Sequence, residues 1–224
     1  MNKKIDIVLV VDCSTSLLKQ KECIETAVND MVVSIKTNSE LHGCDIYFSL
    51  IPFADKVIED KCIKFKPVKT ITEKISLGSF RYGTNPGPAL KGITNDVIDR
   101  YHKWVEEDDL CFHPLIFFFT DGSPCPFDEC QGDYEEAAKI IKDKEANKKL
   151  LIVGCAFGEG AYIKNMNLMT SYPERILKIK DNTAKTQEKL RRFFTYIIPQ
   201  TTAFTVTGVS DQLPRVFKMF NDME

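Results

Sequence analysis

The chain of 224 residues has no cluster of basic side chains and no long apolar run. Its 30 lysines and arginines face 32 aspartates and glutamates, which leaves a net charge of −2. Nucleic acids and anionic membrane surfaces are bound through clustered Lys and Arg, so the sequence argues against both kinds of partner. No apolar stretch approaches the roughly 20 residues of a transmembrane helix, and no signal-peptide cleavage site follows the first one. We therefore expect a cytoplasmic protein.

Motifs of the common nucleotide-binding enzymes are also absent. The sequence contains no Gly-x4-Gly-Lys-Ser/Thr, and no Gly-x-Gly-x-x-Gly follows its first apolar stretch. The three histidines, His42, His102 and His113, form no cluster with a nucleophile, so surface or core roles are expected for each. Neither internal repeats nor a low-complexity linker divide the chain.

Eight cysteines are scattered along the sequence, at positions 13, 23, 44, 62, 111, 125, 130 and 155. In a chain of this size without an export signal we expect reduced thiols, several of them acting as small hydrophobes. Cys125 and Cys130, with His113, raise the alternative of a zinc site, but zinc sites usually show tighter pairs and four ligands. Zinc is therefore disfavoured. Cys13 is the thiol that we expect to be accessible, because it lies in a polar loop.

That polar loop follows the first apolar stretch, residues 5–11. The stretch is interrupted only by Asp6 and is rich in β-branched residues, which predicts a central strand of a parallel sheet. Ligands of such sheets bind beyond the carboxyl ends of the strands. Asp12, Ser14 and Ser16 supply hard oxygen atoms there, a ligand set suited to Mg²⁺. Taken alone, the loop has an equal alternative, a Ser/Thr-rich cap of the next helix.

Two further segments repeat this design. Residues 114–119 form a second buried apolar run that ends in Thr120, Asp121 and Gly122. Between the two runs, a glycine-rich loop presents Thr84 just before a helical pattern. Three polar segments at the ends or starts of suitable elements favour the metal site over the helix cap.

Together these segments resemble the metal-ion-dependent adhesion site of von Willebrand factor A (vWA) domains. The resemblance covers about residues 4–200 and implies a doubly wound, Rossmann-like α/β fold with a mostly parallel sheet flanked by helices. The five positions of the family's site carry the expected residue types: Asp12, Ser14, Ser16, Thr84 and Asp121. The resemblance implies that the two serines bind the metal directly, and the other three directly or through water. The metal is expected to be Mg²⁺, with Mn²⁺ as the alternative.

The resemblance also implies a function, the binding of an acidic side chain of a partner protein to the metal. Arg81, Asn85 and Ser123 are expected to form the rim of the partner site. Within the family, the chain looks most like bacterial TerY-type proteins, which are associated with tellurium resistance and with stress-response or phage-response gene clusters. This narrower similarity implies an intracellular adaptor that works beside a protein kinase and a phosphatase. It rests on residues 50–53, 83–85, 89–90, 120–124 and 153–158.

We expect an interaction module rather than an enzyme. Neutral hydroxyls activate water poorly, and the motif supplies no general base. The alternative is a haloacid-dehalogenase-like phosphatase that uses Asp12. Such an enzyme needs a general acid two residues later, where this chain has Ser14, and a lysine at the phosphoryl group, for which there is no clear candidate.

Apolar periodicity predicts the remaining elements. Helices are expected over about residues 17–37, 86–105, 133–148 and 190–198, the third opened by a capping box at Asp133 and the last limited by Pro199. A short helix is expected near residues 162–169. Strands are expected over about residues 44–54, 150–156 and 175–179, with an edge arm up to Phe65. We assign residues 1–200 to the vWA domain and residues 201–224 to a tail that adds an edge strand or stays mobile.

Overall fold

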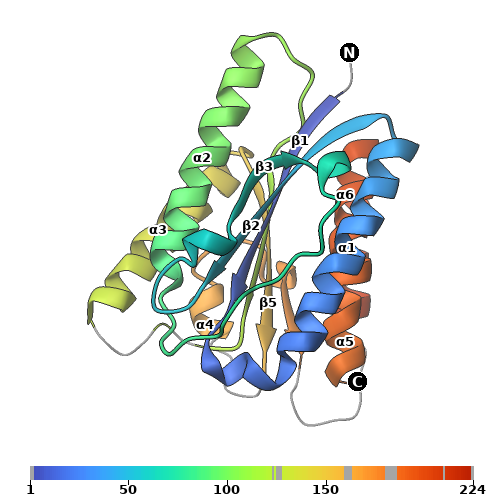
Figure 1. Cartoon of the computed structure of the whole chain (residues 1–224). Coiled ribbons are helices and arrows are strands. Elements are labelled where there is room, and N and C mark those ends of the chain that lie inside the picture. Colours follow the sequence, from blue (N-terminus) through green and yellow to red (C-terminus); the bar gives the residue numbers. More distant parts are fainter. Residues whose placement is uncertain are drawn as a thin grey trace.

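A six-stranded sheet forms the middle layer of the computed structural model, which describes residues 3–122, 124, 128–158, 163–179, 186–208 and 210–222 (Figure 1). The strand order is β3-β2-β1-β4-β5-β6. The strands are β1 (Lys3–Asp12), β2 (Cys44–Phe53), β3 (Ile63–Pro67), β4 (Leu115–Thr120), β5 (Leu151–Phe157) and β6 (Ile176–Ile179). All neighbouring strands are parallel except β3, which runs antiparallel to β2 at the edge. The predicted doubly wound α/β fold is confirmed, including its short edge arm.

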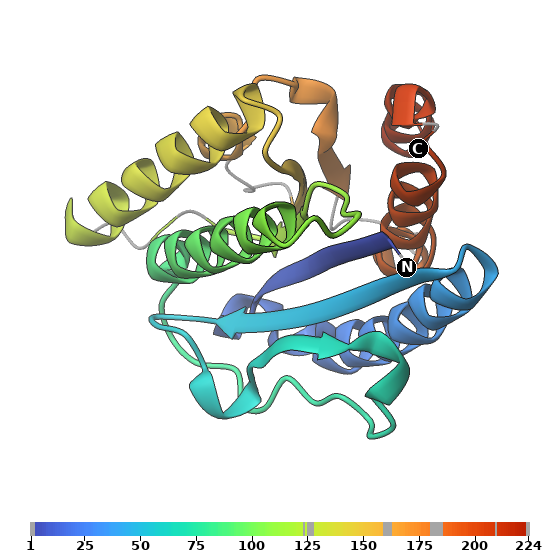
Figure 2. The same ribbon diagram turned by 90° about the horizontal axis from the view of Figure 1, so that it is seen from above.

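Helices cover both faces of the sheet (Figures 1 and 2). One face carries α1 (Lys21–Leu41), α5 (Thr186–Arg192) and α6 (Ile198–Thr207), and the other carries α2 (Pro86–Glu106) and α3 (Asp128–Ala146). Shorter helices are α4 (Ile163–Met166) and α7 (Leu213–Asn221). Short 3₁₀-helices are η1 (Thr15–Gln20), η2 (Glu59–Lys61), η3 (Val68–Thr70), η4 (Pro173–Arg175) and η6 (Ser210–Gln212), and η5 (Phe193–Ile197) is a π-helix.

Strand β1 is apolar on both faces because each face meets a helical layer. Successive side chains of a strand point to opposite faces, so one strand contributes to two cores. Ile5, Ile7, Leu9 and Val11 belong to the core under α1 and α6. Val8 and Val10 belong to the core under α2 and α3. The near-continuous apolar run seen in the sequence follows directly from this double coverage.

Asp6 is the exception in β1, since only 1% of its surface is exposed. Its carboxylate accepts a hydrogen bond from Nε of Arg100 on α2, at 3.1 Å. The Arg100 guanidinium lies 4.3 Å from the ring centre of Phe65 and 4.8 Å from that of Trp104. Burial raises the pKa of Asp6 to about 6, although the charge and the hydrogen bond of Arg100 act to lower it.

Helix α3 begins earlier than predicted. The expected capping box at Asp133 is wrong, because the helix already starts at Asp128. Gly132, directly before the expected capping box, lies inside the helix, where an added Cβ would meet no atom within 4 Å. Gln131 and Glu135 are joined by a side-chain hydrogen bond of 2.8 Å across one turn of this extended start.

The last helix also continues further than predicted. Pro199 does not end it, because η5 links α5 directly to α6 and Pro199 lies in the first turn of α6. The π-helix η5 ends just before Pro199, so the regular α-helical hydrogen-bond pattern that a proline would interrupt is already altered there. The expectation of an added edge strand after residue 200 is wrong for the described residues, which are helical in α6 and α7. The side chain of Asn221 on α7 accepts a hydrogen bond from the Lys178 N–H of β6, at 3.0 Å.

The cysteines are mostly free. Six of those in the described ranges are free thiols, but Cys130 is disulfide-bonded. The expectation of reduced thiols is therefore wrong at Cys130, because it rested on the lack of an export signal and not on local geometry. A disulfide sulfur is not a zinc ligand, and Cys125 lies outside the described residues. Cys13 is fully buried rather than accessible, and burial raises the pKa of its thiol.

Among the described residues, no helix combines the length and the apolar character needed to cross a membrane.

Candidate metal centre

The polar segments meet where the strand order of the sheet reverses. β1 lies between β2 and β4, and the chain winds outwards from β1 in both directions. The register pairs Val11 with Phe119, so Asp12 and Thr120 end neighbouring parallel strands at the same edge. Crevices at such switch points are the usual ligand sites of open α/β sheets.

The loop after β1 is held by backbone hydrogen bonds. The Ser14 N–H donates to Oδ1 of Asp12 at 2.8 Å, which closes a tight turn. The Arg81 N–H donates to the carbonyl of Cys13 and the Thr15 N–H donates to the carbonyl of Arg81, both at 2.9 Å. The turn and the strand-like pairing with residue 81 fix the direction of the serine side chains.

Four of the five predicted ligands form one hydrogen-bonded chain. The hydroxyl oxygens of Ser14 and Ser16 are 2.8 Å apart. Oγ of Ser16 donates to Oδ1 of Asp121 at 3.0 Å, a contact between residues 105 positions apart in the sequence. Asp12 joins the chain through its bond to the Ser14 N–H. The oxygen atoms that the sequence placed in separate segments are therefore neighbours in the fold.

Thr84, the fifth predicted ligand, approaches from the start of α2. Its hydroxyl oxygen lies close to Gly122, the residue after Asp121: a Cβ added to that glycine would be 3.8 Å from it. The next residue, Asn85, donates from Nδ2 to the carboxylate of Asp133 on α3, at 3.4 Å. A Cβ at Gly87 would lie 2.6 Å from the Asp133 backbone, so a glycine is required where α2 meets α3. These contacts place the Thr84 loop against the loop after β4.

Thr120 has a role that the sequence reasoning missed. Its hydroxyl donates to Oδ2 of Asp12 at 2.6 Å and accepts the Gly122 N–H at 3.2 Å. It therefore holds the Asp12 carboxylate in place and links it to the loop of Asp121. The available signal was a hydroxyl side chain at the last position of a buried strand, directly before an aspartate.

The electrostatics of this cluster favour a cation. Asp12 has no exposed surface. Burial, together with the nearby Asp121 carboxylate, raises the pKa of Asp12 to about 6, against the lowering effect of the Thr120 hydrogen bond. At neutral pH a buried carboxylate beside a second one is costly, and a bound cation would offset this cost.

The spacing of the oxygens also suits an octahedral ion. Adjacent ligands at about 2.1 Å from Mg²⁺ lie about 3.0 Å apart, against about 3.4 Å for tetrahedral ligands at the same distance. The two contacts along the chain measure 2.8 Å and 3.0 Å, lengths that serve equally as hydrogen bonds. No group of three His, Cys, Asp or Glu side chains gathers in the described part of the chain. The donor set thus consists of two carboxylates and three hydroxyls, which suits a hard cation.

The predicted rim residues lie in different settings. Arg81 is exposed beside Ser14, to which its backbone is paired. Asn85 is partly buried and bonded to Asp133, so it anchors the Thr84 loop. Ser123 lies outside the described residues.

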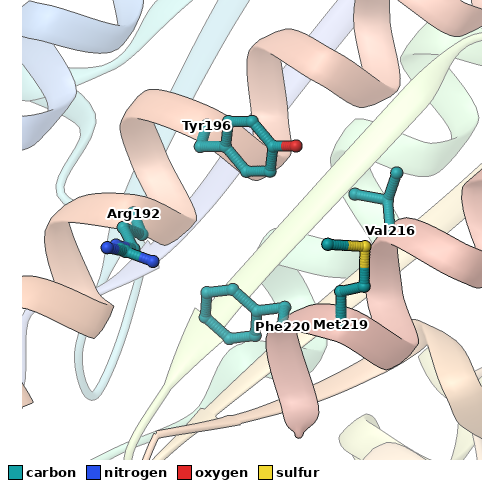
Figure 3. Close-up of a pocket in the computed structure, with 5 residues that line it drawn as sticks. All are labelled: Arg192, Tyr196, Val216, Met219 and Phe220. Atoms are coloured by element: carbon teal, nitrogen blue, oxygen red, sulfur yellow. The ribbon is translucent and has the colours of Figure 1, made fainter. Parts of the chain in front are cut away.

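A separate cavity lies between the helical segment formed by α5 and η5 and helix α7 (Figure 3). Its volume is about 240 Å³, and its lining residues are Arg192, Tyr196, Val216, Met219 and Phe220. None of these described lining residues carries a carboxylate, and the predicted metal ligands lie elsewhere.

Solved structures share this fold. Neither a protein-family model nor a curated protein sequence matches the chain. Proximal thread matrix protein 1 (PTMP1) from the mussel byssus superposes with a TM-score of 0.62 at 14% identity, over 90% of this chain and 49% of PTMP1. The pilus adhesin SpaC from Lactobacillus rhamnosus GG, in its open conformation, gives 0.60 at 15% identity, over 89% of this chain and 30% of SpaC. The chain has a vWA-like fold.

A further PTMP1 structure is described with a zinc-occupied MIDAS motif, the abbreviation for a metal-ion-dependent adhesion site. It gives a TM-score of 0.58 at 16% identity, over 90% of this chain and 48% of PTMP1. This vWA-like chain thus spans less than half the length of these neighbours. The narrower resemblance to TerY-type proteins stays a prediction.

Proposed function

We propose that this vWA-like chain is a metal-dependent protein-interaction module. A divalent cation, Mg²⁺ first and Mn²⁺ as the alternative, would be held by Asp12, Ser14, Ser16, Thr84 and Asp121. The observation that carries the proposal is the continuous chain of contacts from Asp12 through both serines to Asp121, at the switch point of the sheet. The zinc-occupied MIDAS motif of PTMP1 supports a divalent cation in this fold.

Each group has a role that follows from its contacts. The hydroxyls of Ser14 and Ser16 face one another and present lone pairs to the ion. Asp12 orients the site, because its two oxygens accept from the Ser14 N–H and the Thr120 hydroxyl. When bound, the cation supplies an electrophilic position at which a carboxylate of a partner protein replaces water.

Interaction fits these residues better than hydrolysis. A phosphatase of the haloacid-dehalogenase type needs the Asp12 carboxylate as an accessible nucleophile. Asp12 has no exposed surface, and both of its oxygens already accept hydrogen bonds. Position 14 carries a serine in place of the general acid. We therefore propose that the chain is not an enzyme.

The cellular role is proposed on the sequence resemblance alone. A TerY-like adaptor would work in the cytoplasm in a stress or phage response, beside a kinase or a phosphatase that supplies the acidic side chain. The narrower similarity of residues 50–53 and 153–158 supports this assignment.

Calorimetric titration of Mg²⁺ and of Mn²⁺ into the whole chain tests the metal site. Ser14→Ala removes a hydroxyl of the cluster and should weaken metal affinity at least tenfold, the effect typical of lost ligand-sphere groups. Ser34→Ala is the matched control, because the Ser34 hydroxyl on α1 donates to the Asp30 carbonyl at 3.1 Å and contacts none of the predicted metal ligands. Equal metal affinity in the two variants, both shown folded by circular dichroism, would overturn the proposal.

A further inference from the structure

Two large apolar side chains stand exposed beside the proposed metal site. Tyr82 is 86% exposed and Leu18 is 55% exposed. Tyr82 lies between Arg81, which pairs with Ser14, and the loop of Thr84. Leu18 lies in η1, which also contains Ser16, and its sequence neighbour Leu17 is fully buried. Single exposed apolar residues are common on protein surfaces, but these two belong to segments whose backbones are both hydrogen-bonded to residues 13–15, the loop of the predicted site.

The backbone around Tyr82 is anchored on both sides. Arg81 makes its two backbone hydrogen bonds to the loop after β1. Three residues further on, the Asn85 N–H donates to the Ala54 carbonyl at 2.6 Å. Gly83 has a φ of +86°, and a Cβ there would lie 3.1 Å from Cβ of Asp55. The exposed ring therefore projects from a segment that is pinned to two neighbouring loops.

Other exposed tyrosines have neighbours that account for their position. The ring of Tyr172 lies 4.0 Å from the Arg175 guanidinium. Tyr196 lines the cavity beside α7 (Figure 3). Tyr82 has no ring contact, cation–π contact or side-chain hydrogen bond within the described part of the chain.

The same surface carries a cation that suits an acidic partner. Arg81 is exposed, and its side chain makes no ion pair with the described residues. Lys19, which follows Leu18 in η1, instead lines a hollow with Glu22 of α1 and Arg191 of α5. The surface beside the predicted metal thus combines apolar groups with a positive charge.

We propose that the partner presents a short acidic segment with a large apolar side chain within two residues of the metal-binding carboxylate. Tyr82 and Leu18 receive this apolar side chain, while Arg81 attracts a further acidic group of the segment. The inference rests on the proposed function and adds the chemistry that selects among acidic partners. Tyrosine suits this role, because its rigid ring buries a large area at a small entropic cost and dominates many interfaces.

The test uses a random-peptide display library selected on the immobilised whole chain in millimolar Mg²⁺, with elution by EDTA. The eluted peptides should carry Asp or Glu with Phe, Leu, Ile or a similar residue within two positions. Tyr82→Ala should weaken their binding about tenfold or more, as truncation of a central interface tyrosine does. Tyr82→Phe should retain the affinity within about twofold, because the ring supplies most of the contact. Tyr196→Ala is the control for loss of an exposed tyrosine elsewhere.

The outcomes separate the two proposals. Acidic peptides without an apolar neighbour, or equal binding by the Tyr82→Ala and Tyr196→Ala variants, would overturn this inference and leave the metal-dependent interaction standing. A library that yields no peptide eluted by EDTA would overturn both.

Discussion

Replacing the buried Asp6 by asparagine should remove a large part of the pH dependence of stability. Burial raises the pKa of Asp6 to about 6 in the folded chain, from 3.8 as the ordinary value. Between these two values the folded state binds more protons than the unfolded state, so the free energy of unfolding falls as pH rises. The raised pKa of Asp6 corresponds to about 3 kcal/mol of unfolding free energy in total, of which about 2 kcal/mol is lost between pH 4.5 and pH 7.

Urea unfolding followed by circular dichroism measures this effect. Samples contain EDTA, so that metal binding does not contribute, and cover pH 4.5 to pH 7.5. The free energy of unfolding of the wild type should fall by about 2 kcal/mol relative to that of Asp6→Asn across this window. Asp30→Asn, at an exposed position of α1, should follow the wild type at every pH. If the free energies of unfolding of the wild type and of Asp6→Asn change in parallel with pH, the raised pKa of Asp6 in its buried pair with Arg100 is refuted.

Two further substitutions test the support of the metal loops. Thr120→Val keeps the side-chain shape but removes the hydroxyl that holds Asp12, and should weaken Mg²⁺ binding about tenfold in calorimetry. Thr94→Val is its control, since the buried Thr94 hydroxyl has no hydrogen-bond partner among the described residues. Equal Mg²⁺ affinity in both variants would count against the role of Thr120. Gly83→Ala should lower the free energy of unfolding by about 1–2 kcal/mol, because the left-handed backbone disfavours a side chain and Asp55 crowds it. Gly92→Ala on α2, where a Cβ meets no atom within 4 Å, should instead raise it by about 0.5–1 kcal/mol, and a loss equal to that of Gly83→Ala would contradict this reading.

Strands covered on both faces were predictable because their local sequence is almost purely apolar. β1, β4 and β5 each form such a run, and the polar residues at their ends then indicated the position of the site. The sequence also placed β3 at the edge, where its weak alternation matches one-sided coverage. In these cases the local pattern and the tertiary environment agree.

Other features depend on contacts that no local pattern reveals. A helix was expected to start directly after Gly132 and another to end before Pro199, but the fold accommodates both residues inside helices. The partner of Asp6 was hidden because Arg100 is 94 residues away in the sequence. The role of Thr120 appears only when the register of β1 and β4 brings it to Asp12, at 2.6 Å.

Crystallography of the chain in millimolar Mn²⁺, with anomalous diffraction to locate the ion, tests the central claim most directly. The account predicts one anomalous peak at oxygen-ligand distance, about 2.1–2.2 Å, from the hydroxyls of Ser14 and Ser16. Thr84, Asp12 and Asp121 should surround that peak directly or through water, with water or a foreign carboxylate at the open positions. An ion bound elsewhere, or no peak at these five residues, would contradict the account.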